Sequence, residues 1–173
     1  MAGWYMLSVI GKDRPGIVAG LTRALYEGGC NLGEASMLRL GESFAVMLMA
    51  EHGGDAAGLD ALVQPVAREM DLRIKVDPVE GHVHGNLTPD VRIAVFGADR
   101  AGIVAQVTGA LAEAGLNILD LRSDVARGGQ GPVYILQIEG QALQGVEALE
   151  RALARGEAQG LDVSIEPIDT LVG

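Results

Sequence analysis

A short loop bounded by glycines, of a kind that suits amino-acid binding, occurs twice in the chain. Its members are Gly11, Asp13, Arg14 and Gly16 in the first copy, and Gly97, Asp99, Arg100 and Gly102 in the second. The glycines let a ligand approach the backbone closely. Backbone N–H groups at the start of a following helix attract a carboxylate, and the aspartate can accept hydrogen bonds from an ammonium group. The loop therefore predicts a site for an amino acid.

The same residues also have a purely structural interpretation. An aspartate before a helix often caps that helix, and glycine often makes a turn. Asn31 and Asn117 each lie two residues after a glycine, Gly29 or Gly115, that is expected to end a helix as a left-handed cap. Asparagine tolerates a left-handed turn, but its amide also offers a donor and an acceptor to a ligand. Both interpretations stay open at this point.

The loops and the asparagines belong to a segment that the chain contains twice. Residues 11–36 align with residues 97–122 without a gap, and about half of the positions are identical. An internal repeat predicts two copies of one module. In each copy the hydrophobic residues alternate, then follow a helical period, in an order that predicts β-α-β-β-α-β. The expected fold class is α+β, with two ferredoxin-like domains that each place two helices on one face of an antiparallel sheet.

Glycine and proline residues, which favour turns and loops, indicate the domain boundaries. We expect a first domain over residues 1–78, a linker over 79–89 and a second domain over 90–173. The linker contains His82 and His84. Two imidazoles without a third nearby ligand make a poor metal site, so no metal is expected.

Three local features lead to specific structural predictions. Gly41 begins a tight hairpin turn in the first copy, whereas the glycine-rich residues 127–131 predict a longer hairpin loop in the second. The helical stripe of the first copy includes Val18 on its predicted buried face. Pro65 lies inside the second helical pattern of the first copy and is expected to kink or shorten that helix.

Composition argues against several classes of protein. The 173 residues carry a net charge of −10 and no basic run, which opposes direct binding to nucleic acid because such binding neutralises phosphates with Lys and Arg. Aromatic residues make up 3%, too few for the stacking platforms of RNA-binding domains with a similar fold. The longest apolar stretch, residues 44–50, is far shorter than a membrane span. We expect a soluble cytoplasmic protein that does not bind membranes.

The sequence also lacks the patterns of common enzymes. No Ser–His–Asp or Cys–His–Asn arrangement recurs in the two copies, and no phosphate loop or dinucleotide-binding motif is present. Cys30 is the single cysteine, so no intrachain disulfide forms, and we expect it to be a small buried apolar residue. The chain is predicted to have no catalytic residues and no cofactor.

Taken together, the motifs resemble the ACT domain family. A strand precedes D-R-P-G-I-V, a helix ends in E-G-G-x-N-L, and two strands and a second helix follow. The resemblance covers both halves outside the linker. It implies small regulatory modules that often sense amino acids. Two such modules without an attached enzyme or DNA-binding domain are similar to the group of transcriptional repressors of the glycine cleavage system.

The resemblance also implies where a ligand would lie. In amino-acid-binding ACT domains that pair side by side, the ligand occupies the interface between modules. By position, Asp13 and its loop would face Asn117 of a partner module, and Asp99 and its loop would face Asn31. Some serine-sensing relatives carry a histidine two positions before the acidic or amide residue, where this chain has Gly11 or Gly97. The identity of the ligand is therefore open.

These observations lead to one functional hypothesis and two alternatives. The chain is expected to be a non-enzymatic regulator that binds a small amino acid between modules, acts on transcription through a protein partner such as a transcription factor, and forms homo-oligomers. One alternative is a protein-interaction module with a vestigial ligand site. The other is a detached regulatory subunit of an amino-acid metabolic enzyme.

The charge makes a direct prediction about DNA. We expect the purified protein to leave the fluorescence anisotropy of labelled operator DNA unchanged at physiological salt, because a net charge of −10 repels the phosphate backbone. A tight complex formed without any added protein would contradict the prediction.

Overall fold

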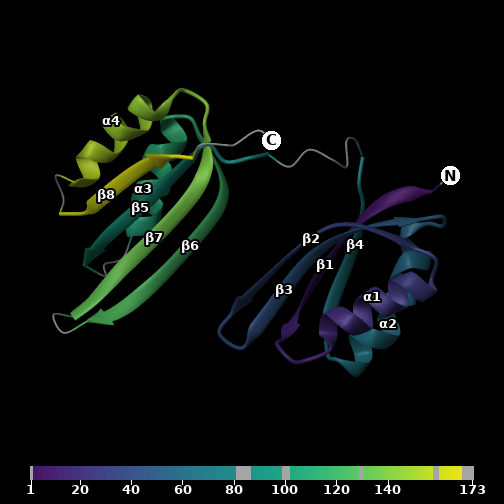
Figure 1. Ribbon diagram of the computed structural model, residues 1–173. Coiled ribbons are helices and arrows are strands. Elements are labelled where there is room, and N and C mark those ends of the chain that lie inside the picture. The colour runs from purple at the N-terminus through teal and green to yellow at the C-terminus, as the bar shows by residue number, and fades with distance from the viewer. Residues whose placement is uncertain (1, 81–86, 99–101, 129–130, 158–159, 169–173) are drawn as a thin grey trace. The chain divides into compact units, whose positions relative to one another are not determined.

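The computed structural model describes residues 2–80, 87–98, 102–128, 131–157 and 160–168. It divides the chain into two compact units, Met1–Gly85 and Asn86–Gly173. Each unit has the order β-α-β-β-α-β (Figure 1). The predicted α+β class with two ferredoxin-like modules is therefore confirmed.

The two units are built from equivalent elements. The first contains β1 (Gly3–Lys12), α1 (Ile17–Glu27), β2 (Asn31–Leu40), β3 (Ser43–His52), α2 (Ala56–Glu69) and β4 (Arg73–Pro78). The second contains β5 (Val91–Ala98), α3 (Ile103–Glu113), β6 (Leu116–Gly128), β7 (Gly131–Ala142), α4 (Val146–Glu157) and β8 (Asp162–Pro167). The strand orders are β2-β3-β1-β4 and β6-β7-β5-β8, and all pairings are antiparallel.

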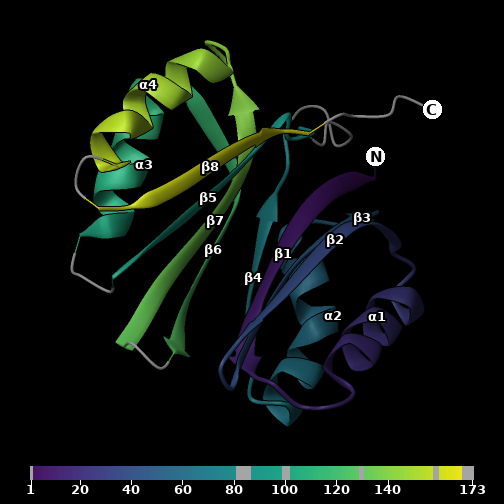
Figure 2. The same ribbon diagram turned by 60° about the vertical axis from the view of Figure 1, so that its left-hand side comes forward.

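In each unit both helices cover one face of the sheet (Figure 2), and the core lies between these layers. In the first unit Leu7 and Val9 of β1 are buried with Leu21 of α1. The second unit has an equivalent core that includes Ile93 of β5. Val18, which the helical stripe placed on the buried face, is 45% exposed, because it lies one position around the helix from the buried row.

The end of α1 shows why the repeated glycine is there. Gly29 has φ of 74°, and its N–H donates to the carbonyl of Tyr26 while the N–H of Cys30 donates to the carbonyl of Leu25. This is the Schellman arrangement, which favours glycine because side chains rarely adopt that φ. Gly115 has φ of 81° at the end of α3. The predicted left-handed caps are confirmed in both units.

The prediction of a longer loop in the second hairpin is wrong. The β2–β3 ladder ends with the pair Leu40 and Ser43, and the β6–β7 ladder ends with the pair Gly128 and Gly131. Two residues connect the strands in each case. The additional residues instead lengthen β6 and β7 to 13 and 12 residues, against 10 and 10 in β2 and β3. Adding whole residue pairs to an antiparallel ladder leaves every other side chain on its original face of the sheet, so the extension does not disturb the core.

Of the two effects expected of Pro65, a kinked or a shortened helix, the shortening does not occur. The helix α2 continues past Pro65 to Glu69. Proline removes one backbone hydrogen bond, but Leu59, Val63 and Ala67 on the same helix are all buried in the core. Packing against the sheet therefore maintains a helix that the local sequence disfavours.

The second unit offers a sharp test of its strand packing. A Cβ atom at Gly140 would lie 2.4 Å from the backbone oxygen of Asn117, whereas one at Gly109 in α3 meets nothing within 4 Å. We expect Gly140→Ala to lower the free energy of unfolding of this unit by about 1–3 kcal/mol through overpacking. We expect Gly109→Ala to raise it by about 0.5–1 kcal/mol, because alanine favours the helix.

Urea titration followed by circular dichroism measures both changes. Trp4, the single tryptophan, lies in the first unit, so its fluorescence midpoint serves as the internal control and should stay constant. A Gly140→Ala variant as stable as the wild type would contradict the packing described here.

Candidate functional site

The first predicted loop joins β1 to α1 and is attached to the neighbouring hairpin. The backbone N–H of Asp13 donates to the carbonyl of Glu42 over 2.8 Å. The Asp13 Oδ2 atom forms an ion pair with Arg39 Nε, also at 2.8 Å, with 33% of the aspartate side chain and 65% of the arginine side chain exposed. Arg39 lies near the end of β2, so these contacts tie the loop to the β2–β3 hairpin. Arg14 is exposed.

The helices that follow the loops begin without a side-chain cap. Gly16 is the N-cap of α1 with φ of 93°, and Gly102 is the N-cap of α3 with φ of 90°; neither helix receives a capping hydrogen bond from a side chain. The interpretation of Asp13 as a helix cap is therefore wrong, because the left-handed glycine stands between the aspartate and the helix. Asp99 and Arg100 lie outside the described residues.

Asn31 lies at the first position of β2, far from the loop of its own unit. It is paired in register with Glu51, and its Nδ2 donates to Glu51 Oε2 over 3.0 Å. The loop follows Lys12, which is paired with Ser43 at the other end of β3. Ser43 and Glu51 are eight positions apart on this strand, which corresponds to roughly 26 Å. One unit by itself does not bring Asp13 and Asn31 together.

The second unit has different side chains around the equivalent positions. Asn117 is paired in register with Gln141 rather than with a carboxylate, and the Gln141 amide donates to the carbonyl of Thr88 over 3.2 Å. Val125 stands at the register position that corresponds to Arg39. The two copies therefore share the asparagine but not the ionic contacts of the first unit.

Gly11 and Gly97 have a packing role that the sequence did not reveal. A Cβ atom at Gly11 would lie 2.6 Å from Leu72 Cδ2, and one at Gly97 would lie 2.6 Å from Leu161 Cδ2. Both leucines are buried. The close contact with the residue before the last strand accounts for both glycines without a ligand.

Sequence analysis missed Arg39. The signal for it was the hairpin register: a two-residue turn after Leu40 places Arg39 opposite Phe44 and so beside the end of β1. The alternation of apolar and polar residues alone does not indicate that contact, because it shows on which face of the sheet a side chain lies but not which residue of the next strand lies beside it.

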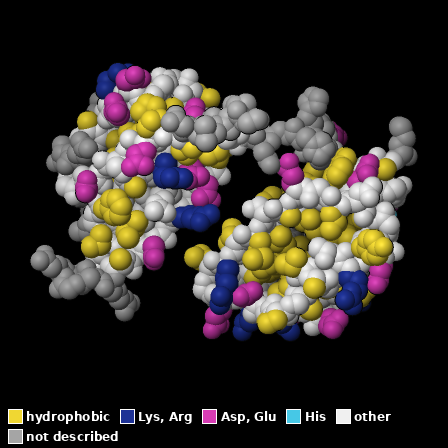
Figure 3. Space-filling view, in the orientation of Figure 1, with side chains coloured by type: hydrophobic (Ala, Val, Ile, Leu, Met, Phe, Trp, Pro, Cys, Tyr) yellow, Lys and Arg dark blue, Asp and Glu magenta, His cyan; other side chains and the backbone are white. Residues whose placement is uncertain are grey.

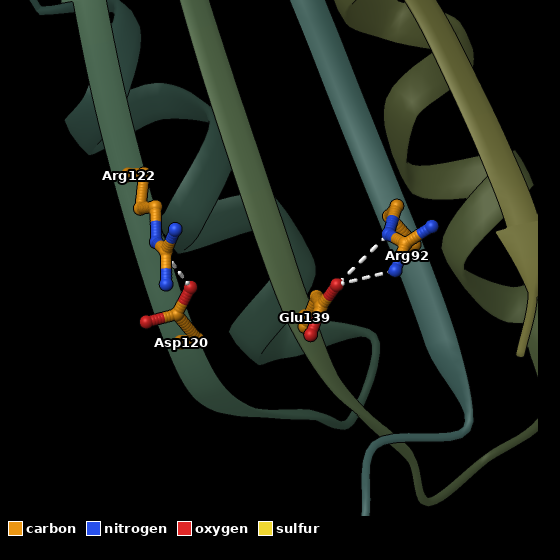
Figure 4. A network of polar contacts seen from close by, with 4 residues as sticks. All are labelled: Arg92, Asp120, Arg122 and Glu139. Carbon is orange, nitrogen blue, oxygen red and sulfur yellow. Dashed lines mark hydrogen bonds and ion pairs between the residues drawn. The ribbon is translucent and has the colours of Figure 1, made fainter. Parts of the chain in front are cut away.

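A second polar group, also missed, lies on the sheet of the second unit. Its members, Arg92, Asp120, Arg122, Gln137 and Glu139, line a depression of about 310 Å³. Figure 4 shows the four charged members. Nε and Nη2 of Arg92 lie 2.8 and 2.7 Å from Glu139 Oε1, and Nε of Arg122 lies 3.1 Å from Asp120 Oδ2. These side chains are well exposed, so each pair contributes less than about 1 kcal/mol to stability.

Cys30 is buried, as predicted. Its Sγ lies 3.6 Å from His52 Nδ1, and burial raises the pKa of the thiol above its usual value. Leu116 occupies the equivalent place in the second unit and is equally buried. The cysteine therefore serves as a small core residue.

Other kinds of site find no support in the part of the chain that the structure describes. Within those residues no three His, Cys, Asp or Glu side chains are grouped to hold a metal ion. His82 and His84 lie outside the described residues. Among the helices described, none has the length and apolar character needed to cross a bilayer.

Comparison with known proteins identifies the modules. Residues 5–77 and residues 91–156 each match the ACT domain family. The chain is 26% identical over 121 residues to the glycine cleavage system transcriptional repressor of Escherichia coli, a match that spans 69% of this chain and 64% of the relative. It is also 31% identical over 75 residues to the UPF0237 protein MK1213 of Methanopyrus kandleri, covering 34% of this chain and 83% of that one.

A solved structure shares the fold over almost the whole chain. An unknown protein from Galdieria sulphuraria superimposes with a TM-score of 0.81 at 24% identity, and the match covers 97% of this chain and 99% of that one. At this level of identity the likeness establishes the fold alone.

The environment of Cys30 predicts slow thiol chemistry. We expect Ellman's reagent to react with the native protein far more slowly than with an exposed cysteine, and to need a higher pH, because burial raises the pKa and so reduces the thiolate that reacts. Stopped-flow absorbance measures the rate, and full labelling in urea gives the end point. The control is Cys30→Ser combined with Tyr26→Cys, since Tyr26 is 78% exposed. Equal rates for the two proteins would contradict the prediction.

Proposed function

This chain belongs to the ACT domain family, with two such domains in tandem, and we propose that it is a non-enzymatic regulator that binds a small amino acid between modules. The observation that carries the proposal is the repeated, uncapped helix start beside an acidic loop. Gly16 and Gly102 open α1 and α3 in the same left-handed conformation without a side-chain cap. Helix N–H groups left in this way suit a carboxylate.

The aspartate supplies the complementary charge for the ligand's ammonium group. Asp13 lies in the loop that leads to α1, and Arg39 contacts its Oδ2 atom. A carboxylate has acceptor capacity for several hydrogen bonds, so this ion pair orients Asp13 without using all of it. Arg39 also adds positive charge near the helix start, which favours the ligand carboxylate. We extend the same role to Asp99 of the second loop.

The asparagines complete the proposed site from an adjoining module. The strand β2 is an edge strand that is exposed along nearly all of its length, and exposed strand edges readily pair with another strand. Antiparallel pairing of two such edges would set the start of one strand, with Asn31 or Asn117, beside the end of the other. That end lies next to the loop, where Arg39 contacts Asp13.

The regulatory effect would come from the ligand's preference for one arrangement of modules. A ligand shifts an equilibrium only by its difference in affinity for the two states. Pairing across the site would change the surface that a protein partner meets. The relative from Escherichia coli is named as a transcriptional repressor, so we propose a transcription factor as that partner, reached without direct contact with DNA.

The second candidate function is protein contact alone, with a vestigial ligand site. The contacts of the first unit favour it in one respect, since Asp13 is already paired with Arg39 and Asn31 with Glu51. A side chain that has an internal partner gives up part of that interaction when it binds a ligand.

Calorimetry distinguishes the two candidates. A thermal-shift screen of the twenty amino acids selects the ligand, which is then titrated into the wild type and into Asp13→Ala, Asp99→Ala, Asn31→Ala and Asn117→Ala. A charge-assisted hydrogen bond contributes about 1.5–3 kcal/mol, so removing an aspartate should weaken binding by about 10- to 100-fold. Unequal losses between the copies would show which loop binds.

The matched control is Asp60→Ala, whose carboxylate contacts Gln64 within α2 and should leave affinity unchanged. Unchanged affinity in all four site variants would place the ligand elsewhere. A wild type that binds none of the twenty amino acids would support the vestigial site.

A further inference from the structure

The two proposed ligand loops differ in charge at positions that the strand register makes equivalent. At the first loop lie Lys12, the last residue of β1, and Arg39 of β2. The register gives Ala98 and Val125 as their counterparts in the second unit. The first loop therefore has a cation at two positions where the second unit has an uncharged, apolar residue.

Arg39 contacts the first loop through its side chain. Its Nε lies 2.8 Å from Asp13 Oδ2, and 65% of the side chain is exposed. In the space-filling view, Lys and Arg side chains, with acidic ones among them, lie along the edge of this unit where β1 and the β2–β3 hairpin end (Figure 3). A guanidinium has several N–H donors in a planar fork and binds carboxylates in a bidentate way. The contact with Asp13 through Nε therefore leaves Arg39 able to bind a further anionic group.

The corresponding position of the second unit is apolar and exposed. Val125 is 41% exposed, and Val133 on the next strand, the counterpart of Ser43, is 40% exposed. Arg127 lies two positions further along β6, beyond the last residue pair of the ladder in the first unit. An uncharged group therefore occupies the place from which Arg39 reaches the loop of the first unit.

The ion pair between Arg39 and Asp13 affects which ligands the first loop favours. In the proposed function the start of α1 binds the ligand's carboxylate and Asp13 binds its ammonium group. An amino acid with an uncharged side chain would share Asp13 with Arg39 and offer the guanidinium no new partner. An amino acid with a second carboxylate in its side chain would offer one, so that both members of the original ion pair keep a partner of opposite charge.

We propose that Arg39 is a specificity-determining residue that makes the first loop selective for a dicarboxylic amino acid, aspartate or glutamate. The second loop, with Val125 at the same position, favours an amino acid with an uncharged side chain. This inference rests on the proposed function, because it assigns the side-chain preference of that same site. It gives the two modules different ligands on one fold.

A purely structural role for Arg39 makes a different prediction. The ion pair ties the loop to the β2–β3 hairpin, so a loop that merely lost this support would bind all amino acids more weakly by a similar factor. Selectivity is a difference between two affinities. Asparagine and glutamine have nearly the same shape as aspartate and glutamate but lack the side-chain charge, so the ratio of acid to amide affinity isolates the selectivity.

Calorimetric titration with these matched ligands tests the proposal. The Asp99→Ala protein, in which the second loop is disabled, is titrated at neutral pH with aspartate, asparagine, glutamate and glutamine. We expect the better acid to bind about 5- to 10-fold more tightly than its amide, toward the lower end for a charge-assisted hydrogen bond because Arg39 is largely exposed. Adding Arg39→Val should weaken the acid and not the amide, which brings the ratio of the two affinities close to unity.

The matched control is Arg122→Val in the same background. Arg122 is an exposed arginine of β6, the counterpart of β2, and it too is paired with an aspartate. Its loss removes the same charge from the chain without touching the first loop, so the ratio should not change. The reciprocal variant, Val125→Arg in the Asp13→Ala background, should raise the ratio of acid to amide affinity at the second loop.

The outcomes separate this inference from the proposed function. Circular dichroism checks the fold of each variant, and the reciprocal variant provides the test if Arg39→Val does not fold. The inference fails if the first loop binds acids no better than amides, if Arg39→Val weakens both by the same factor, or if folded Val125→Arg leaves the second loop's ratio unchanged. In those cases the chain still binds an amino acid and the proposed function stands. A chain that binds none of the twenty amino acids overturns both.

Discussion

The antiparallel pairing of the two central strands, β1 with β3 in the first unit and β5 with β7 in the second, under a layer of two helices, is the constraint on which the rest of each unit depends. It sets Leu7 opposite Leu48 in the first unit and Ile93 opposite Ile138 in the second, and all four side chains are buried. Because alternate residues of a strand face opposite sides, burying this row determines which residues form the outer face. The same pairing determines the end of the sheet at which the acidic loop emerges.

One fold thus supports two surfaces with different chemistry. The buried side is equivalent in the two units, whereas the outer side differs at several register positions: Met6, Met47 and Leu38 of the first unit correspond to Arg92, Gln137 and Asp124 of the second. The contacts near the loop have diverged as well, since Arg39 holds Asp13 in the first unit and Val125 stands at the corresponding position in the second. Divergence of this kind costs little stability, because exposed ion pairs and exposed apolar side chains contribute little to the core.

Much of the fold was predictable because its signals are local or repeated. The repeat indicated two modules, hydrophobic periodicity indicated the order of strands and helices, and Gly29 and Gly115 marked helix ends through a conformation that few other residues adopt. Some predictions were wrong where packing opposed a local preference. The helix α2 continues past Pro65 because its apolar row is buried, and the extra hairpin residues extend the ladder instead of forming a loop.

The sequence by itself determined the α+β class, the two modules, the candidate loops with their asparagines, and the buried place of Cys30. These follow from periodicity, from the repeat and from the conformational limits of glycine. Only the tertiary structure decided that Asp13 contacts Arg39 and does not cap its helix, and that Asn31 lies at the far end of the same sheet. Those facts depend on strand register, which joins residues distant in sequence and is set by the packing of the whole sheet.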